Sequence, residues 1–581
     1  MSHPSSRTEL TEGGMSRRAV LEALSGLLLG MFVSILAGTV VSTSMPRIIS
    51  ELGGDQAAFT WVVTSTLLAT TVSTPIWGKL ADIFNRKRLI QTSLVIFVLG
   101  SALAGFSQDP GTLIGFRVVQ GLGAGGLTAL SQIIMADIIS PRERGRYMGL
   151  FGAVMAVGTV GGPLAGGLIT DAFGWRWNFF VALPFAVAAI LLLQKTLVLP
   201  ERPRSAARID FLGAVLLSGG VSLLLIWVTL AGKDFEWLST PSLVMVGAAV
   251  IMIIALVIVE MRASDPIIPL TLFRNRTFTL SVIASISVGT AMFGTSVFLG
   301  QYMQLARGSS PTESGLMTLP MIGGMLITST VVGQLITRYG KWKPYMVVGS
   351  LLLAAGMFLM GTIHYDTNFV LVSVYMLMLG AGIGMVMQNL VLIVQNAVPA
   401  TQLGVASSGV AFFRSLGGTV GVSVMGAVLA TRVSDLLAGK QTEITAAIAQ
   451  LGPEKGPAVA ESLASGTLPQ LSELPESIRT IIESIYGDSV AHIFLIAAPL
   501  AIITIIAVLF LPPKELSTAT ASERQTAETP TGPRTGSLDA AHVREASRPG
   551  ALATDEALAS TGSIPTFRSE AHRPPTDGPS A

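Results

Sequence analysis

The sequence predicts an all-α membrane protein with fourteen transmembrane helices, arranged as two pseudo-symmetric six-helix bundles plus two inserted helices. Half of the 581 residues are hydrophobic, only 12% are charged, and the mean hydropathy is +0.64. One water-soluble core could not bury so many apolar side chains, so the lipid bilayer must act as the solvent. The other two observations behind this fold class are the number of long apolar segments and an internal repeat.

Fourteen apolar windows are long enough to cross a hydrocarbon core of about 30 Å. They begin near residues 22, 58, 89, 111, 147, 177, 209, 240, 276, 313, 344, 368, 405 and 488. We divide them into a first bundle at 21–200, two inserted helices at 201–262 and a second bundle at 263–515.

The internal repeat relates the two bundles. The motif that begins at Gly78 recurs at Gly333, 255 residues later, and three basic residues follow each copy. The glycine pair that begins at Gly161 recurs at Gly417, 256 residues later. Two matches at nearly one offset indicate duplicated halves with two helices inserted between them, although chance pairing of abundant glycines is the alternative for either match alone.

Loop charges predict the orientation. The N-terminal segment 1–20 and the loops after the even-numbered spans carry most of the loop Lys and Arg residues. By the positive-inside rule, both termini are expected in the cytoplasm and the protein in the inner (plasma) membrane. Arg17 and Arg18 precede the first window without a convincing cleavage site after it, so we interpret that window as an uncleaved first helix.

Two segments are expected outside the membrane. Residues 434–487 are predicted to form a polar external loop, with a short surface helix at 476–486. This loop is a candidate docking site for an external partner. The segment 516–581 is rich in Ser, Thr, Pro, Ala and charge, with too few apolar residues to form a core. We therefore expect a disordered cytoplasmic tail.

Composition excludes several classes of function. The chain has no Cys, and its five His residues show no spacing typical of a metal site or a catalytic triad. No Gly-rich phosphate loop precedes a helix. The basic residues lie in short loops rather than in one patch, which argues against nucleic-acid binding. We predict neither an enzyme nor a metal or cofactor site.

The most informative loop, 78–88, places five charges between two apolar windows. Such a loop is typical of a cytoplasmic turn. Its residues Gly78, Leu80, Asp82 and Arg86 resemble the pattern G-x-L-a-D-r-x-G-r-k of major facilitator superfamily transporters, with the second Gly replaced by Asn85.

Three further motifs make the resemblance more specific. Arg117 and Gln120 fit the pattern R-x-x-Q-G, segment 158–167 fits g-x-x-x-G-P-x-x-G-G, and segment 175–180 fits W-R-W-x-F. With these motifs in order, the chain from about residue 20 to about residue 515 is similar to the fourteen-helix drug:proton antiporters of the EmrB/QacA type.

The resemblance implies a role for the charged loop. Gly78, Asp82, Arg86 and Arg88 would form a cytoplasmic latch whose charge pairing and helix-terminus contacts favour the outward-facing state. The alternative for Asp82 and Arg86 is a solvated ion pair of little energetic weight.

The resemblance also assigns a glycine motif to the interface between the halves. Its residues are Gly158, Gly162, Pro163 and Gly167. Small residues let membrane helices approach closely, and Pro163 removes one backbone donor and permits a bend. Tight static packing is the alternative.

One departure from the family pattern concerns the proton. The family pattern has an Asp in the first span at the position of Ala37, so the usual proton carrier is absent. The proton-coupling candidates are Arg117, Asp137 and Glu313, with Asp82 as a further acid. The proton gradient would supply the energy.

Polar residues inside the spans are the substrate-cavity candidates. They are Gln120, Gln388, Asn389 and Arg414. An unpaired Arg inside a bilayer costs several kcal/mol, so Arg117 and Arg414 should face a wet cavity or a partner, or else hydrogen-bond backbone carbonyls. With Ala37, the two arginines favour neutral or anionic substrates over cations.

The function implied by the resemblance is multidrug efflux by alternating access, in which protons enter as a small amphipathic or hydrophobic substrate leaves. Export of an endogenous lipid, siderophore or polyketide is the first alternative. A non-transporting membrane sensor or scaffold that signals through the tail is the second.

Overall fold

The computed structural model describes residues 17–53, 56–199, 210–232, 235–309, 311–449, 475–520 and 523–524. The predicted N-terminal segment, most of the predicted tail and the middle of the 434–487 loop therefore lie outside the described residues. The described part is helical, apart from turns, short linkers and one isolated β-bridge between Ala231 and Phe235.

Seven helices form the first set, which we call the N half: α1 (Arg17–Glu51), α2 (Gln56–Ile83), α3 (Arg86–Gly105), α4 (Pro110–Ile138), α5 (Gly145–Phe173), α6 (Trp177–Phe180) and α7 (Ala182–Thr196). Two helices follow: α8 (Phe211–Leu230) and α9 (Thr240–Arg262). The elements of the second set, the C half, are η1 (Leu270–Arg274), α10 (Arg276–Gln301), η2 (Tyr302–Ala306), α11 (Pro311–Met317), α12 (Leu319–Tyr339), α13 (Lys343–Met360), α14 (Phe369–Ala397), η3 (Ala400–Gln402), α15 (Leu403–Gly439), α16 (Gln441–Ala449) and α18 (Glu476–Phe510).

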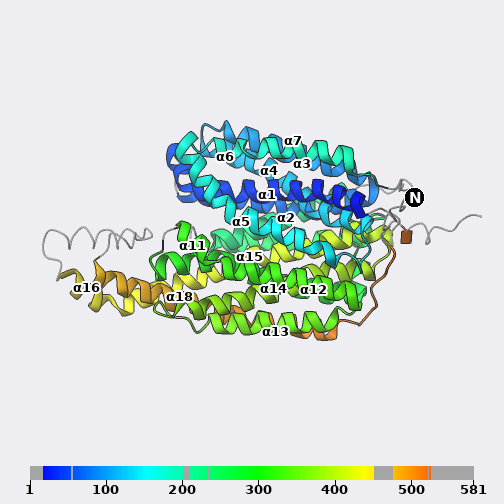
Figure 1. The fold of residues 1–581 in the computed structure, drawn as a ribbon. Helices are drawn as coiled ribbons and strands as arrows, with labels where there is room; N and C mark the ends of the chain where they lie inside the picture. The colour runs from blue at the N-terminus through cyan, green and yellow to red at the C-terminus, as the bar shows by residue number, and fades with distance from the viewer. Residues whose placement is uncertain are drawn as a thin grey trace, which may run out of the picture. The chain divides into compact units, whose positions relative to one another are not determined.

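The two halves use the same helix pairings. In the N half, α4 packs against α2 and α3, and α1 packs against α5. In the C half, α14 packs against α12 and α13, and α10 packs against α15 (Figure 1). The halves meet where α2 contacts α15 and where α5 contacts α12, which is again one pairing used twice.

The inserted helices α8 and α9 pack on each other, and α8 also contacts α2 and α15. The pair therefore lies beside the α2–α15 junction between the halves. An apolar cluster joins these three helices to the linker after α9: Val72, Leu217, Val221, Leu225, Ile267, Ile268 and Phe412.

Local sequence explains where several helices begin and end. The Asn85 side chain accepts hydrogen bonds from the amides of Lys87 and Arg88, so the residue that replaces the family's Gly caps the N-terminus of α3. Asp109 caps α4, which has Pro110 in its first turn. Gly340, with φ of 71°, ends α12 in the left-handed conformation.

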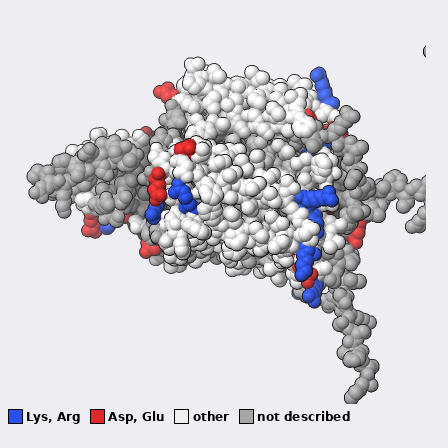
Figure 2. Space-filling view, turned by 90° about the horizontal axis from the view of Figure 1, so that it is seen from above, with Lys and Arg blue, Asp and Glu red and all other residues white. Residues whose placement is uncertain are grey.

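Within the described residues, twelve helices are long and apolar enough to cross a membrane. The helices α2 and α5, with 28 and 29 residues, are not among these twelve, although both are long enough to span. The count of fourteen spans therefore stays a prediction. Figure 2 shows a broad surface without charged residues between two charged ends, as a bilayer requires.

Two predicted segment boundaries were wrong. The predicted external loop 434–487 begins inside α15, includes α16, and ends inside α18, so residues 476–486 form the first turns of a long helix rather than a separate one. The predicted tail begins too early, because the Ser517 amide donates to Asn396 Oδ1 (2.9 Å) and Arg524 Nη2 donates to the Gln395 carbonyl (3.0 Å). These hydrogen bonds attach the chain after α18 to α14.

Candidate functional site

At the junction of α2 and α15, each helix has a glycine at the point of contact. A side chain at Gly78 of α2 would overlap the Ser408 side chain of α15 and lie 3.0 Å from the Gly404 carbonyl oxygen. A Cβ on Gly404 would lie 2.5 Å from the Gly78 carbonyl oxygen. The backbones of the two halves therefore approach more closely here than larger residues would allow.

The Asp82 carboxylate caps α15 from the opposite half. Its Oδ1 accepts the Gly404 amide at 2.9 Å and its Oδ2 accepts the Val405 amide at 3.0 Å. First-turn amides have no partner within their own helix, and the positive end of the helix dipole favours an anion there. One carboxylate thus satisfies two buried donors across the junction.

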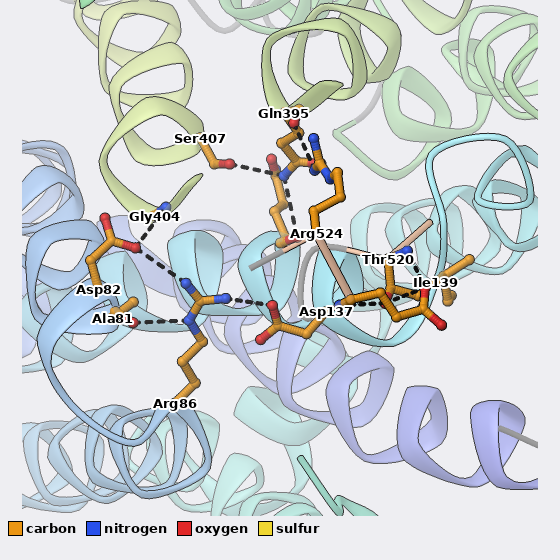
Figure 3. Close-up of polar contacts among 12 residues, drawn as sticks. Ala81, Asp82, Arg86, Asp137, Ile139, Gln395, Gly404, Ser407, Thr520 and Arg524 are labelled. Atoms are coloured by element: carbon orange, nitrogen blue, oxygen red, sulfur yellow. Dashed lines mark hydrogen bonds and ion pairs between the residues drawn. The ribbon is translucent and has the colours of Figure 1, made fainter. Parts of the chain in front are cut away.

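Arg86 holds Asp82 in place. Its guanidinium is 3.1 Å from Asp82 Oδ1 and 2.6 Å from Asp137 Oδ1 at the end of α4, and its Nε donates to the Ala81 carbonyl (Figure 3). The side chains of all three charged residues are at most 9% exposed. The arrangement is therefore a buried network that orients Asp82, and the alternative of a solvated ion pair does not describe it.

A second polar junction lies close to the first. Arg144, before α5, donates to the Gln395 side chain of α14, and Gln395 Nε2 donates to Ser407 Oγ of α15 at 2.9 Å (Figure 3 shows the Gln395–Ser407 bond). Burial lowers the pKa of Arg144 to about 9, and the nearby Arg524 lowers it while Asp137 raises it. Burial of this cation costs free energy because the charge leaves water, and the hydrogen bond to Gln395 offsets part of that cost.

The repeat aligns Asp82 with Thr337 of α12, 255 residues later. The Thr337 backbone carbonyl accepts a hydrogen bond from Arg142 Nε, in the other half, at 3.4 Å. The C half thus has no carboxylate at this position, and the two junctions are asymmetric. Sequence reasoning missed Arg142 and Arg144, although the repeat could have pointed to Thr337.

A cavity of about 1580 Å³ lies beside the first junction. It is lined by residues of α2, α3, α9, the linker to α10 and the start of α15, including Lys79, Asp82, Arg86 and Glu260. The predicted latch residue Arg88 is exposed and also lines this cavity. No side-chain hydrogen bond of Arg88 occurs among the described residues, so Arg88 does not share the network of Arg86.

The substrate-cavity candidates do not come together in one cavity. Gln388 and Asn389 line a small pocket of about 10 Å³ with Gln132 and Gln395. Gln120 accepts from Arg117 Nη1 at 2.8 Å inside the N half, where Arg117 Nε also donates to the Val62 carbonyl (3.4 Å).

Arg414 is 6% exposed, and its Nη1 is buried without a partner among the described residues. The proton-coupling candidates are also separated. Asp137 belongs to the Arg86 network, whereas Glu313 is exposed in α11, at the far end of α12 from the Thr337 junction. Ala37 is fully buried in the apolar core of the N half.

The glycine motif of α5 was assigned to the wrong interface. A Cβ on Gly158 would lie 2.7 Å from Ile35, and one on Gly162 would overlap Thr39, both on α1 of the same half. The Thr39 hydroxyl donates to the Gly158 carbonyl at 2.9 Å. Gly167 has open space around it, and the Pro163 side chain lies outside the described residues. The motif packs α5 on α1, which leaves another face of α5 for α12.

The Major Facilitator Superfamily model matches residues 27–422. The chain belongs to the major facilitator superfamily. It is therefore a membrane transporter and not an enzyme. In the described part of the chain, no group of three or more His, Asp or Glu residues could hold a metal ion.

Relatives in this superfamily are named for multidrug transport, for multidrug resistance or for tetracenomycin C export. The chain is 37% identical to the multidrug transporter protein MdtP of Bacillus subtilis (strain 168), over 74% of this chain and 78% of the relative. It is 31% identical to multidrug resistance protein 3 of the same organism, over 84% and 94%. It is 28% identical to the tetracenomycin C resistance and export protein of Streptomyces glaucescens, over 84% and 90%.

Solved structures show the same superfamily fold. The human organic anion transporter MFSD10 aligns with a TM-score of 0.54 at 15% identity, over 83% of this chain and 99% of that one. The proton:xylose symporter XylE aligns with a TM-score of 0.57 at 14% identity, over 88% and 99%. The transporter is thus an all-helical superfamily member related to efflux pumps.

Proposed function

We propose that this superfamily member exports amphipathic or hydrophobic small molecules by alternating access and that proton entry drives the export. The observation that carries the proposal is the capping of α15 by Asp82, because this bond must break whenever the halves part on that side. The relatives named as multidrug transporters supply the substrate class.

One end of the helices carries Arg86 at the start of α3, Arg144 in the loop before α5 and Lys341 in the loop before α13. We place this basic end in the cytoplasm, with both termini, by the positive-inside rule. The two junctions then close the cytoplasmic side, so that Gly78, Asp82 and Arg86 act as a latch that favours the outward-facing state.

Proton coupling would act through this latch. A proton on Asp82 or Asp137 removes one of the two charges that Arg86 bridges, and on Asp82 it also weakens the cap on α15. Each charge-assisted hydrogen bond contributes about 1.5–3 kcal/mol, enough to move a two-state equilibrium by about ten-fold or more. Glu313, exposed at the opposite end, is a candidate for proton entry.

Substrate charge follows from the buried cation of α15. Arg414 Nη1 has no hydrogen-bond partner within the described part of the chain, and position 37 is Ala rather than a carboxylate. An uncompensated buried cation favours an anion or a neutral acceptor over a second cation. We therefore propose neutral or anionic substrates.

Everted vesicles with an imposed proton gradient test the proposal. Matched anionic and cationic dyes are added, and proton leakage and dye accumulation are followed together. We expect gradient-dependent accumulation of the anionic or neutral dye that the Asp82→Asn protein loses. Accumulation independent of the gradient would refute proton coupling, and a preference for lipophilic cations would refute the assignment of substrate charge.

Export of an endogenous polyketide is the second candidate, because one relative is named for tetracenomycin C export. The same vesicles distinguish the two functions. Transport of an aromatic polyketide with no transport of the dye panel would favour the narrow exporter.

A further inference from the structure

Two carboxylates of the inserted helices border the same residue, Gly213, at the basic end. Glu260 of α9 is 5% exposed. Asp210 caps α8 by accepting the Gly213 amide through Oδ1 at 2.8 Å. A Cβ on Gly213 would lie 2.5 Å from Asp210 Oδ2 and 3.1 Å from Glu260 Oε1, so both oxygens lie close to one point.

The pair lacks a bonded cation within the described residues. Asp210 Oδ2 is buried and has no hydrogen-bond partner there. Two charged side chains act on Glu260, Asp210 of α8 and Lys79 of α2. Lys79 is only 9% exposed, lines the same cavity as Glu260 and forms no ion pair with it. Two carboxylates that border one residue and repel each other, without a bonded cation, favour sharing one proton.

Glu260 also holds the linker between the inserted helices and the C half. Its Oε1 accepts the Ile267 amide and its Oε2 accepts the Ile268 amide, both at 3.2 Å. These two isoleucines are buried against Val72 of α2 and Phe412 of α15. The carboxylate thus fixes a linker that packs beside the α2–α15 junction.

We propose that Glu260 and Asp210 form a proton-binding site of the inserted helices that couples proton binding to docking of this linker. Ionised Glu260 accepts both amides. When a proton from cavity water binds a Glu260 oxygen, the new O–H donates to Asp210 Oδ2 and that oxygen releases its amide. Loss of the proton to the same water restores both bonds. The coupling role rests on the proposed export function, whereas proton binding itself does not.

Infrared spectroscopy of the purified full chain in lipid vesicles measures the proton directly. We follow the carbonyl band of protonated carboxyls from about pH 5 to about pH 9. We expect a titrating component that is lost in Glu260→Gln, moved in Asp210→Asn and kept in Glu236→Gln, a matched change of an exposed acid before α9. An unchanged band in folded Glu260→Gln would overturn the proposal. If that variant misfolds, Glu260→Asp must show the component at a shifted pH, and an unshifted band would equally overturn it.

Thiol labelling measures how exposed the linker after α9 is. The chain contains no Cys, so Ile267→Cys introduces a single thiol. Only the thiolate reacts, so each labelling rate is divided by that of the denatured protein at the same pH. This ratio should rise about ten-fold as the pH falls, which corresponds to one charge-assisted hydrogen bond, and it should not change with pH in the Glu260→Gln protein. A ratio that depends on pH equally in both proteins would exclude linker coupling. Absent proton-driven transport with an intact Glu260 band would refute the proposed function alone.

Discussion

The Asp82 carboxylate lies 2.9 Å from the Gly404 amide, although 322 residues separate them in the chain. Gly404 donates that hydrogen bond and, without a Cβ, leaves room for the carboxylate. The contact joins a loop-proximal acid of one half to the positive end of a helix in the other. Closure of this side therefore depends on one charge and two glycines, Gly78 and Gly404.

Asp82→Asn should open the junction. The amide side chain keeps the size but loses the charge, so both α15 amides lose a charge-assisted bond of about 1.5–3 kcal/mol each. Leu403→Cys reports the opening, because Leu403 is fully buried in the apolar cluster of the N half. We expect its labelling to rise about ten-fold or more. Asp109→Asn, an exposed helix cap of α4, is the control, and equal labelling in the two variants would contradict the latch.

Gly78→Ala should separate the halves by steric overlap with Ser408, at a cost of about 1–3 kcal/mol to the closed state. Adding Ser408→Gly removes the overlapping side chain and should restore most of the closure. Leu403→Cys labelling measures both variants. Gly115→Ala, at a helical glycine with nothing within 4 Å, should have no such effect. Failure of the double variant to recover would show that overlap is not the cause.

Arg86→Ala should destabilise the protein by about 3–5 kcal/mol, because Asp82 and Asp137 would remain buried without their cation. Thermal unfolding of the purified protein measures the loss. Asp137→Asn added to Arg86→Ala should recover part of it by removing one charge. Arg88→Ala changes an exposed neighbour and should leave the melting temperature nearly unchanged. Similar losses for both arginines would argue that general charge, rather than the network, matters.

Gln395→Leu should weaken the second junction. The change keeps the volume but removes the acceptor for Arg144 and the donor to Ser407, each costing about 1–3 kcal/mol when left unsatisfied. Labelling of Leu403→Cys and thermal unfolding should both report the loss. Gln388→Leu, on the same helix and half-buried, provides the comparison. Equal effects would show that the helix tolerates neither change and that Arg144 has no special part.

Much of the fold could be predicted because apolar length and helix caps are local. The windows near 111 and 368 became α4 and α14, which begin at the caps Asp109 and Asn368. The 255-residue offset predicted duplicated halves, and the two halves do use the same helix pairings. The extended helices α15 and α18 show where composition alone misjudged a boundary.

The sequence by itself determined that the chain is a helical, duplicated membrane protein with a charged loop at Asp82 and Arg86, since each of these properties resides in neighbouring residues. Only the tertiary structure decided that Asp82 caps α15 and that Gln395 accepts a hydrogen bond from Arg144. It also decided that Gly158 and Gly162 face α1. The physical reason is that a motif specifies which groups need partners, whereas helix packing across hundreds of residues selects which partners reach them.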